Sequence, residues 1–440
     1  MNTMKKSGIL FVVVMMCSLS MAFASGASES SGEGIELSIL SHQVRTEVGE
    51  GGFVTGFFSA LDEYIEDNPE IAIAHEGLDQ TAYQTKITSL GAANDMPDIF
   101  MLKGSWVNTF VDNGWVVDIS AELNADPEWK NGYIQGGFDA VTKNGKIYGI
   151  PQESMTTSLV FYNEDMWREI GYDTFPATWE ELQNAVEKFK AKGIDTFAMG
   201  NRANWPAESC WLSTLGDRLT GTDWTNKIIS NDPGVKFTDP EFVRSLEVFQ
   251  ELAEQGAFNP DINSINELEA RTYYFNKKAA SIVEGSWLIS IIDSTAPEDV
   301  KSATKLAVLP EIKEGAGGAN TASGGPAWFL AISNSVTGEE REAAIELLKY
   351  LTGPKQANVT ASSGGITAWA NPDYDKAKVI PLQQEYNSFI QNVRAVPIYD
   401  AAMEASVIET MNVGLQSLLI GEKSPATLAE EIQREQDRIQ

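Results

Sequence analysis

A short polar island interrupts an apolar part of the chain at Gln152, Glu153 and Ser154. The segment before it, 147–151, ends in a proline that cannot donate to a sheet ladder, and the segment after it, 158–162, is a run of strand-forming residues. An unpaired carboxylate is costly to bury, so a ligand explains Glu153 better than core packing does. Carboxylates accept hydrogen bonds strongly, and amides both donate and accept them. We therefore predict that this segment passes a ligand cleft.

Polar residues also follow three predicted strands, at 35–40, 71–74 and 97–101. Helical patterns separate these strands, which indicates a largely parallel sheet. In such open sheets ligands bind outside the carboxyl ends of the strands. This rule selects the residues that come next as ligand-binding candidates: His42, Gln43, Asp79, Gln80, Ser105 and Trp106. Asp79 has an equal alternative, because it could simply cap the helix that follows.

The chain has eleven tryptophans, and four of them stand beside polar residues at predicted strand ends: Trp106, Trp205, Trp287 and Trp369. Trp205 follows Asn204 in a predicted turn. The flat faces of a pyranose ring stack on aromatic planes, and its hydroxyl groups need directional polar partners, so the pattern favours carbohydrate. Core or structural roles are expected for the remaining seven: Trp115, Trp129, Trp167, Trp179, Trp211, Trp224 and Trp328.

Motifs of enzymes are missing from the sequence. His42 and His75 are the only histidines, too few for a histidine-based metal site or a catalytic triad, and there is no P-loop, H-E-x-x-H or G-x-S-x-G motif. No metal, cofactor or catalytic residue is therefore expected. Glu153 and Glu284 are the carboxylates that a secreted glycoside hydrolase could use, so that enzyme class stays open as an alternative.

The elements that must position these residues alternate between strand and helix, which predicts an α/β fold. A chain of 440 residues exceeds one ordinary domain, and no internal linker rich in glycine or serine divides it, so two interwoven lobes are expected. Thr178 and Glu181 predict a capping box, and 306–310 reads as a strand closed by a proline. The formal net charge of −30 argues against nucleic acid as a partner.

Residues 1–24 have the pattern of a signal peptide: Lys5 and Lys6, an apolar run, then Ala22-Phe23-Ala24. Residues 25–34 read as a flexible leader. Cys17 leaves lipid anchoring as an alternative, although the three residues before it lack the expected small side chain. We expect cleavage after Ala24 and a periplasmic protein whose one remaining cysteine, Cys210, forms no intrachain disulfide.

Several short patterns occur in a fixed order behind this signal. They are Met96–Phe100, the Gly145–Pro151 segment followed by Tyr162-Asn163, Ala279-Ala280 before Gly285-Ser286-Trp287, Leu309-Pro310, Gly324-Gly325, and Gly421–Pro425. In this order they resemble the sugar-binding family (family 1) of bacterial extracellular solute-binding proteins, which includes maltose- and multiple-sugar-binding receptors of ABC importers. The resemblance covers nearly all of the chain after the signal.

This resemblance implies a two-lobed periplasmic-binding-protein fold, each lobe a mostly parallel sheet flanked by helices, with three crossovers between the lobes. Lobe I would comprise 35–150 and 309–352, and lobe II 151–308 and 353–440. Trp287 would be a stacking platform, and Gly324 and Gly325 would let backbone approach the ligand, unless they form an ordinary turn.

The expected protein is a monomeric receptor that closes on a carbohydrate and delivers it to a membrane permease. A receptor of the same shape for a polyol, a glycerol phosphodiester or a peptide is a further alternative. Lys103 and Arg202 are too sparse to favour a phosphate ligand.

Overall fold

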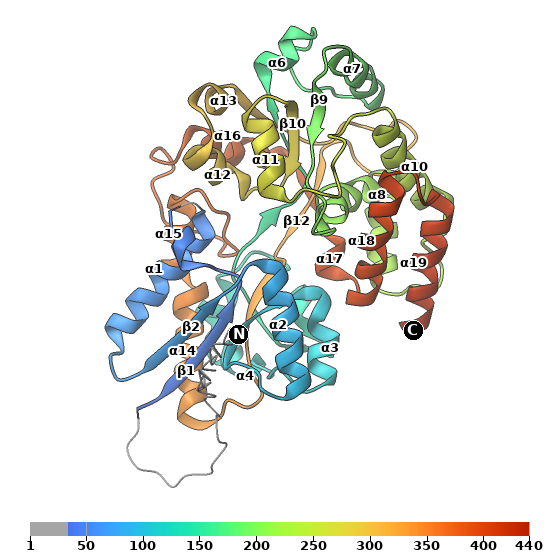
Figure 1. Ribbon diagram of the computed structural model, residues 1–440. Coiled ribbons are helices and arrows are strands. Elements are labelled where there is room, and N and C mark those ends of the chain that lie inside the picture. The colour runs from blue at the N-terminus through green and yellow to red at the C-terminus, as the bar shows by residue number, and fades with distance from the viewer. Residues whose placement is uncertain (1–33, 50, 440) are drawn as a thin grey trace, which may run out of the picture. The chain divides into compact units, whose positions relative to one another are not determined.

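The computed structural model describes residues 34–49 and 51–439. The predicted signal peptide, Cys17 and the leader up to residue 33 lie outside this range. Within it, two main sheets carry the helices, and a third, smaller sheet connects them (Figure 1). No helix among the described residues is long and apolar enough to cross a membrane.

The first sheet has five strands, in which β13 runs opposite to the others. Their order across the sheet is β2 (Ala72–Gly77), β1 (Glu36–Ser41), β3 (Ile99–Lys103), β13 (Trp328–Ile332) and β6 (Ile150–Pro151). The helices whose apolar residues join its core are α1 (Gly52–Asp67), α2 (Gln80–Ala93), α3 (Val107–Asp112), α4 (Ser120–Ala125), α5 (Pro127–Asn131) and α14 (Gly338–Thr352).

The second sheet has four strands, in which β8 runs opposite to the others. Their order is β11 (Thr304–Ala307), β8 (Leu159–Asn163), β10 (Ala279–Glu284) and β9 (Asp195–Ala198). The strand predicted at 306–310 is therefore misplaced, because β11 ends at Ala307. Residues 309 and 310 leave the sheet, and their carbonyl groups bind the side chain of Arg218 instead.

Among the described residues, eleven helices contribute apolar side chains to the core around the second sheet. They are α6 (Glu164–Glu169), α7 (Trp179–Ala191), α8 (Ser213–Thr220), α9 (Thr222–Ile229), α10 (Pro240–Glu254), α11 (Glu267–Phe275), α12 (Leu288–Thr295), α13 (Glu298–Ala303), α16 (Pro381–Phe389), α18 (Ala405–Leu419) and α19 (Pro425–Ile439). The capping box of Thr178 and Glu181 is confirmed at the start of α7. A π-helical segment, η4 (Ala207–Leu212), precedes α8.

Three passages of the chain connect the two sheets. The first runs from β6 through β7 (Met155–Thr156) to β8, and the second runs from β11 through β12 (Thr321–Gly325) to β13. Strand β12 pairs with both β7 and β14 (Arg394–Val396), so the crossovers form a small sheet of their own.

The third passage follows helix α14. Helix α15 (Pro354–Ser362) packs on α1, whereas α16 packs on β11 and α12. The short helix α17 (Tyr399–Ala402) contacts both η4 and the turn η2 (Gly104–Trp106). The two lobes are thus interwoven. The residue boundaries predicted for them stay a prediction, although α15, which the sequence assigned to the second lobe, packs on a helix of the first.

One buried side chain holds the second crossover. Arg218 of α8 is 1% exposed, and burial lowers its pKa to about 10. Its guanidinium donates to four backbone carbonyl oxygens, those of Leu309 (2.8 Å), Pro310 (3.0 Å), Ala319 (2.6 Å) and Thr321 (2.9 Å). Three of these carbonyls lie between β11 and β12, outside any strand, and the fourth belongs to Thr321, the first residue of β12. The arginine therefore supplies donors to buried carbonyls of this segment.

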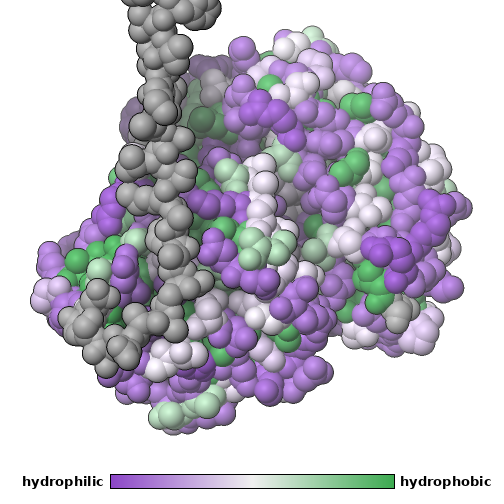
Figure 2. All heavy atoms as spheres, turned by 60° about the horizontal axis from the view of Figure 1, so that its bottom comes forward, coloured by the Kyte–Doolittle hydropathy of each residue, from purple (hydrophilic) through white to green (hydrophobic). Residues whose placement is uncertain are grey.

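The surface in Figure 2 is largely hydrophilic, with apolar residues scattered over it. The exposed large apolar side chains include Val48, Ile65, Leu268, Val413 and Ile420, which are spread over separate parts of the chain. Cys210 is fully buried and free, and burial raises the pKa of its thiol, as expected for a cysteine that serves as a small apolar side chain.

Candidate ligand-binding site

The carboxyl edge of the first sheet carries an aromatic and polar cluster around Trp328. His42 comes directly after β1, and its ring centroid lies 4.5 Å from that of Trp328. The Trp106 ring, after β3, meets Trp328 edge-on at 5.6 Å. Lys103 Nζ lies 5.2 Å from the centroid of the same ring and pairs with Asp400 Oδ2 of α17 at 2.9 Å. The parallel topology therefore brings His42 and Trp106 together, as the strand-end rule predicts.

Buried polar atoms without partners lie in the same cluster. Gln152 is 1% exposed, its backbone N–H donates to the carbonyl of Trp328, and neither polar atom of its amide has a hydrogen-bond partner among the described residues. His42 Nε2 is likewise buried and without a partner in that part of the chain. Buried polar groups in proteins are nearly always paired. These atoms therefore mark where a ligand would bind.

The electrostatics of the cluster favour a neutral imidazole. Burial, together with the positive charge of Lys103, lowers the pKa of His42 to about 3. The ring therefore has one nitrogen to donate and one to accept at neutral pH. Gln43 and Ser105 are also buried at this edge, 5% and 6% exposed.

The ring of Trp106 is less available for ligand stacking than the sequence predicts. Its ring lies nearly parallel to those of Tyr83 and Phe110, at centroid distances of 6.4 and 5.8 Å. These contacts give Trp106 a packing role in the aromatic cluster. Trp328, assigned to structure alone from the sequence, lies at the centre instead. The sequence holds no signal for this, because Trp328 reaches the edge only by starting the one strand of the sheet that runs in reverse.

Asp79 caps helix α2, and Gln80 is the first residue of that helix. The side chain of Asp79 is exposed, and its Oδ1 accepts from the backbone N–H groups of Thr81 (3.1 Å) and Ala82 (3.0 Å). The capping alternative therefore accounts for this carboxylate.

Replacing Asp79 by alanine should lower the free energy of unfolding by about 1 kcal/mol, because two N–H groups lose their acceptor. Urea denaturation measures this effect. Asp79→Asn, which keeps an acceptor oxygen, is the matched control and should retain most of the stability. Equal losses in the two variants would contradict the capping role.

The carboxyl edge of the second sheet presents two tryptophans. Trp287 follows β10, and Trp205 comes directly after the turn that follows β9. These two strands are parallel neighbours. Both rings are half-buried, with centroids 5.9 Å apart and planes inclined by 64°. The turn before Trp205 depends on Asn204, which adopts the left-handed φ of +62° that asparagine tolerates well.

Carboxylates hold both indoles in place. Trp287 Nε1 donates to Glu284 Oε2 at 2.9 Å, and Trp205 Nε1 donates to Glu267 Oε1 at 2.8 Å. Glu284 in turn accepts from Arg271 at 3.0 to 3.1 Å in a buried ion pair. Arg271 was missed from the sequence, since nothing in its neighbourhood distinguishes it. The chain Arg271–Glu284–Trp287 fixes the ring orientation and explains Glu284 without any catalytic role.

Glu153 is the unpaired carboxyl group of the first crossover. It is 3% exposed, and no hydrogen bond or ion pair reaches its side chain from the residues that the structure describes. Burial raises its pKa to about 8, so the group is largely protonated at neutral pH. A protonated carboxyl group both donates and accepts hydrogen bonds, which matches the requirement of a hydroxyl group.

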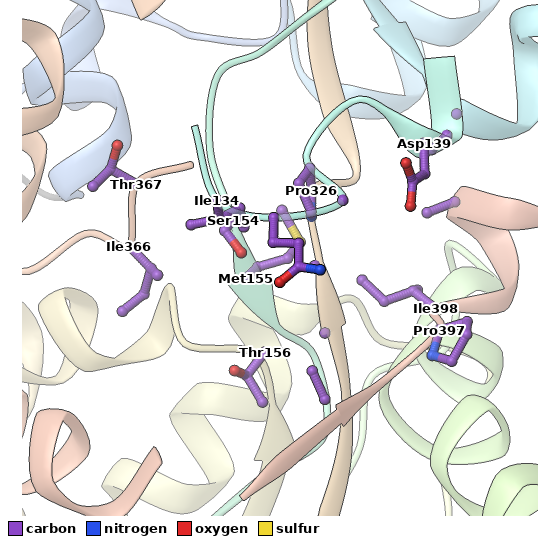
Figure 3. Close-up of a pocket in the computed structure, with 18 of the residues that line it drawn as sticks. Ile134, Asp139, Ser154, Met155, Thr156, Pro326, Ile366, Thr367, Pro397 and Ile398 are labelled. Atoms are coloured by element: carbon purple, nitrogen blue, oxygen red, sulfur yellow. The ribbon is translucent and has the colours of Figure 1, made fainter. Parts of the chain in front are cut away.

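The remaining candidates, Gly324, Gly325 and Trp369, line a cavity of about 860 Å³ next to the crossover strands (Figure 3). A β-carbon on Gly324 would lie 2.9 Å from the carbonyl oxygen of Met155. The close pairing of β12 with β7 therefore explains this glycine without a ligand. The ring of Trp369 packs edge-on against Tyr133 at 5.2 Å.

Residues 54–358 match the family of bacterial extracellular solute-binding proteins. The match covers well over half of the chain, which therefore belongs to this family. Among curated relatives, a binding protein of Brucella abortus is 23% identical over 257 residues, 58% of this chain and 61% of that protein. A multiple sugar-binding protein of Streptococcus mutans is 26% identical over 211 residues, 48% of each chain. The chain thus spans less than two thirds of the length of the Brucella protein and about half of the length of the Streptococcus protein.

Among solved structures, one from work on xylan utilization by the thermophile Caldanaerobius polysaccharolyticus is 24% identical in sequence. It superposes with a TM-score of 0.81 over 91% of this chain and 99% of that one. This likeness confirms the two-lobed α/β fold.

Proposed function

We propose that this protein is the substrate-binding receptor of an ABC importer and that it captures an uncharged carbohydrate between its two lobes. The observation that carries the proposal is the pair of half-buried tryptophans that follow β9 and β10. Trp205 donates to Glu267, the first residue of α11, and Trp287 donates to Glu284, the last residue of β10. Carbohydrate also recurs in the names and titles of similar proteins.

The charges at the two sheet edges support an uncharged ligand. Lys103 is paired with Asp400, and Arg271 is paired with Glu284. Among the described residues, the groups without partners at these edges include the neutral imidazole of His42, the amide of Gln152 and the largely protonated carboxyl group of Glu153. Such groups bind hydroxyl groups well and compensate no ligand charge. An oligosaccharide or glycoside is the ligand class that we infer.

In this proposal the exported protein works as a monomer in the periplasm and has no catalytic activity. The lobes close on the sugar by bending at the crossovers, and the closed form docks on a membrane permease. The sugar drives closure only to the extent that it binds the closed state better than the open one.

Replacing Trp287 by alanine is expected to weaken sugar binding about a hundredfold, because stacking and the desolvation of one pyranose face are lost. Titration of residues 25–440 with mono- and oligosaccharides, followed by tryptophan fluorescence, measures the affinity. Trp115→Ala, which removes a half-buried tryptophan that packs on Phe110, is the matched control and should leave the affinity unchanged.

Chromatography of each mixture afterwards distinguishes a receptor from an enzyme. Intact sugar after saturable binding is the expected result. Cleaved sugar would favour a glycoside hydrolase, and no response to any sugar would favour a receptor of the same fold for another solute. Solution scattering without any change on addition of a bound sugar would contradict lobe closure.

A further inference from the structure

Helix α17 lies where the two lobes meet and contacts η2 of the first and η4 of the second (Figure 1). Ile398, directly before the helix, and Ala401 belong to the apolar core around the first sheet. Tyr399 and Met403 belong to the core around the second sheet. Because protein cores are close-packed, a change in the separation of the lobes has to rearrange contacts of this one short helix.

The side of α17 toward the first sheet carries a buried ion pair. Asp400 Oδ2 accepts from Lys103 Nζ at 2.9 Å, and both side chains are 9% exposed. Lys103 is the last residue of β3. The next residue, Gly104, approaches the helix so closely that a β-carbon there would lie 2.0 Å from the carbonyl oxygen of Ala401. This close approach holds the ammonium group against Asp400.

The other side of α17 is attached to the second lobe by neutral contacts. The backbone N–H of Tyr399 donates to Ser213 Oγ of α8 at 3.0 Å. The ring of Tyr399 lies so near to the same helix that a β-carbon on Gly216 would be 2.2 Å from its hydroxyl oxygen. The helix is thus fixed to the second lobe by its backbone and a large ring, whereas its carboxylate reaches toward the first.

A second buried carboxyl group, Glu208 of η4, lies near the ion pair. It accepts from Ser213 Oγ at 2.6 Å. Burial, and after it the negative charge of Asp400, raise the pKa of Glu208 well above its ordinary value, although the charge of Lys103 acts in the opposite direction. The protonated form of Glu208 is therefore favoured, which leaves Asp400 as the carboxylate that neutralises Lys103.

Lys103 also belongs to the ligand cluster of the first sheet. Its Nζ lies 5.2 Å from the centroid of the Trp328 ring, which is the neighbour of His42. A ligand that covers this ring excludes water from the ion pair, and opposite charges attract each other more strongly where the dielectric constant is lower. Ligand binding therefore strengthens the attraction between β3 and α17, and by linkage the intact pair strengthens ligand binding.

We propose that Asp400 is a positioning residue, whose ion pair with Lys103 ties the Trp328 edge of the first sheet to the second lobe and so couples ligand binding there to the separation of the lobes. The coupling to a ligand rests on the proposed function. The tie itself needs no ligand, so it can be measured in the unliganded protein. Its role is conformational specificity rather than stability, a use for which buried ion pairs are suited.

The first test measures the separation of the lobes without ligand, in residues 25–440. Spin labels at Glu66→Cys of α1 and Glu187→Cys of α7, both exposed positions, report the distance distribution by double electron–electron resonance. Cys210 is fully buried and should remain unlabelled.

Lys103→Met together with Asp400→Leu replaces the ion pair by apolar side chains, an exchange that buried pairs often tolerate without loss of stability. The distance distribution should broaden, because α17 is then attached to the first sheet by packing only. Asp400→Asn, which keeps the shape of the side chain, serves the same purpose if the double variant does not fold.

Arg341→Met together with Glu122→Leu is the matched control. Arg341 of α14 donates to Glu122 of α4 at 2.8 Å, and both helices pack on the first sheet. Loss of this pair should leave the distance distribution unchanged. A native distribution in the variants of Lys103 and Asp400, or equal broadening in the control, would overturn the proposal.

The second test adds maltotriose, xylotriose and triacetylchitotriose as uncharged probes. A probe that binds the native protein should narrow its distance distribution. Asp400→Asn should bind the same probe about tenfold more weakly, because the coupling free energy is lost. Unchanged affinity in this variant would overturn the coupling.

These results separate the inference from the proposed function. Binding that weakens in Trp287→Ala but not in Asp400→Asn supports the sugar site and contradicts the role of Asp400. If none of the three probes binds the native protein, the result counts against the proposed function, and the unliganded comparison alone supports or overturns the tie between the lobes.

Discussion

Replacing Arg218 by leucine is expected to lower the free energy of unfolding by about 4 kcal/mol, the upper range for single substitutions. The guanidinium serves four carbonyl groups of the second crossover, and leucine would leave these acceptors without donors in a buried place. Guanidinium chloride denaturation followed by circular dichroism measures the loss. Amide hydrogen exchange should also accelerate at 309–321, since this loop depends on the arginine.

Arg244→Leu is the matched control. Arg244 lies in α10 and pairs with Glu247 and Glu251 near the surface, where ion pairs contribute less than about 1 kcal/mol. Similar losses of stability in the two variants, or unchanged exchange at 309–321 in Arg218→Leu, would show that the crossover does not depend on this side chain.

Replacing Glu153 by glutamine is expected to remove a destabilisation that develops between about pH 4.5 and pH 8. Burial raises the pKa of Glu153 from its ordinary value of 4.5 to about 8 in the folded protein, which therefore keeps a proton that the unfolded chain releases. Stability is therefore fully present below pH 4.5 and falls as the pH rises toward 8. At 1.36 kcal/mol per pH unit the loss reaches about 5 kcal/mol.

Urea denaturation at pH 5 and at pH 8 measures this effect. The native protein should lose stability between the two values, and Glu153→Gln should lose much less. Glu180→Gln, at an exposed position of α7, is the control and should behave as the native protein does. The pH dependence of stability that comes from His42 has the opposite sign. Its pKa is lowered to about 3 in the folded protein, so the stability that its neutral ring contributes is lost as the pH falls below 6.5. A pH dependence that is unchanged in Glu153→Gln would contradict the unpaired burial of this group.

Much of the fold could be predicted because it depends on local patterns. The helical patterns between the predicted strands, the capping box at Thr178 and the alternation of strand and helix are short-range signals. The structure has the corresponding helices α1 and α7 and the parallel strands β1, β2 and β3. Strand β11 ends earlier than predicted because Arg218, some ninety residues away, competes for the carbonyl groups of 309 and 310. No local pattern reveals such a competitor.

The same distinction between local signals and long-range contacts applies to the residues of the candidate site. His42 and Trp106 meet because parallel strands end at one edge, a rule that needs only the strand assignments. Trp328 and Arg271 could not be selected in this way. Trp328 reaches the same edge by starting a strand that runs in reverse, and Arg271 acts only through Glu284 on Trp287. Both depend on pairings across the fold that a single sequence does not show.

The position of β13 in the first sheet also determines the order in which the lobes can be completed. Strand β13, at 328–332, lies between β3 and β6, whereas the second sheet uses residues 159–307 alone. A chain that emerges from its N-terminus can therefore finish the second sheet before the first. Until residue 332 is available, β3 and β6 have no neighbour on their facing edges. The first sheet thus stays incomplete until late in synthesis, even though most of its strands come early in the chain.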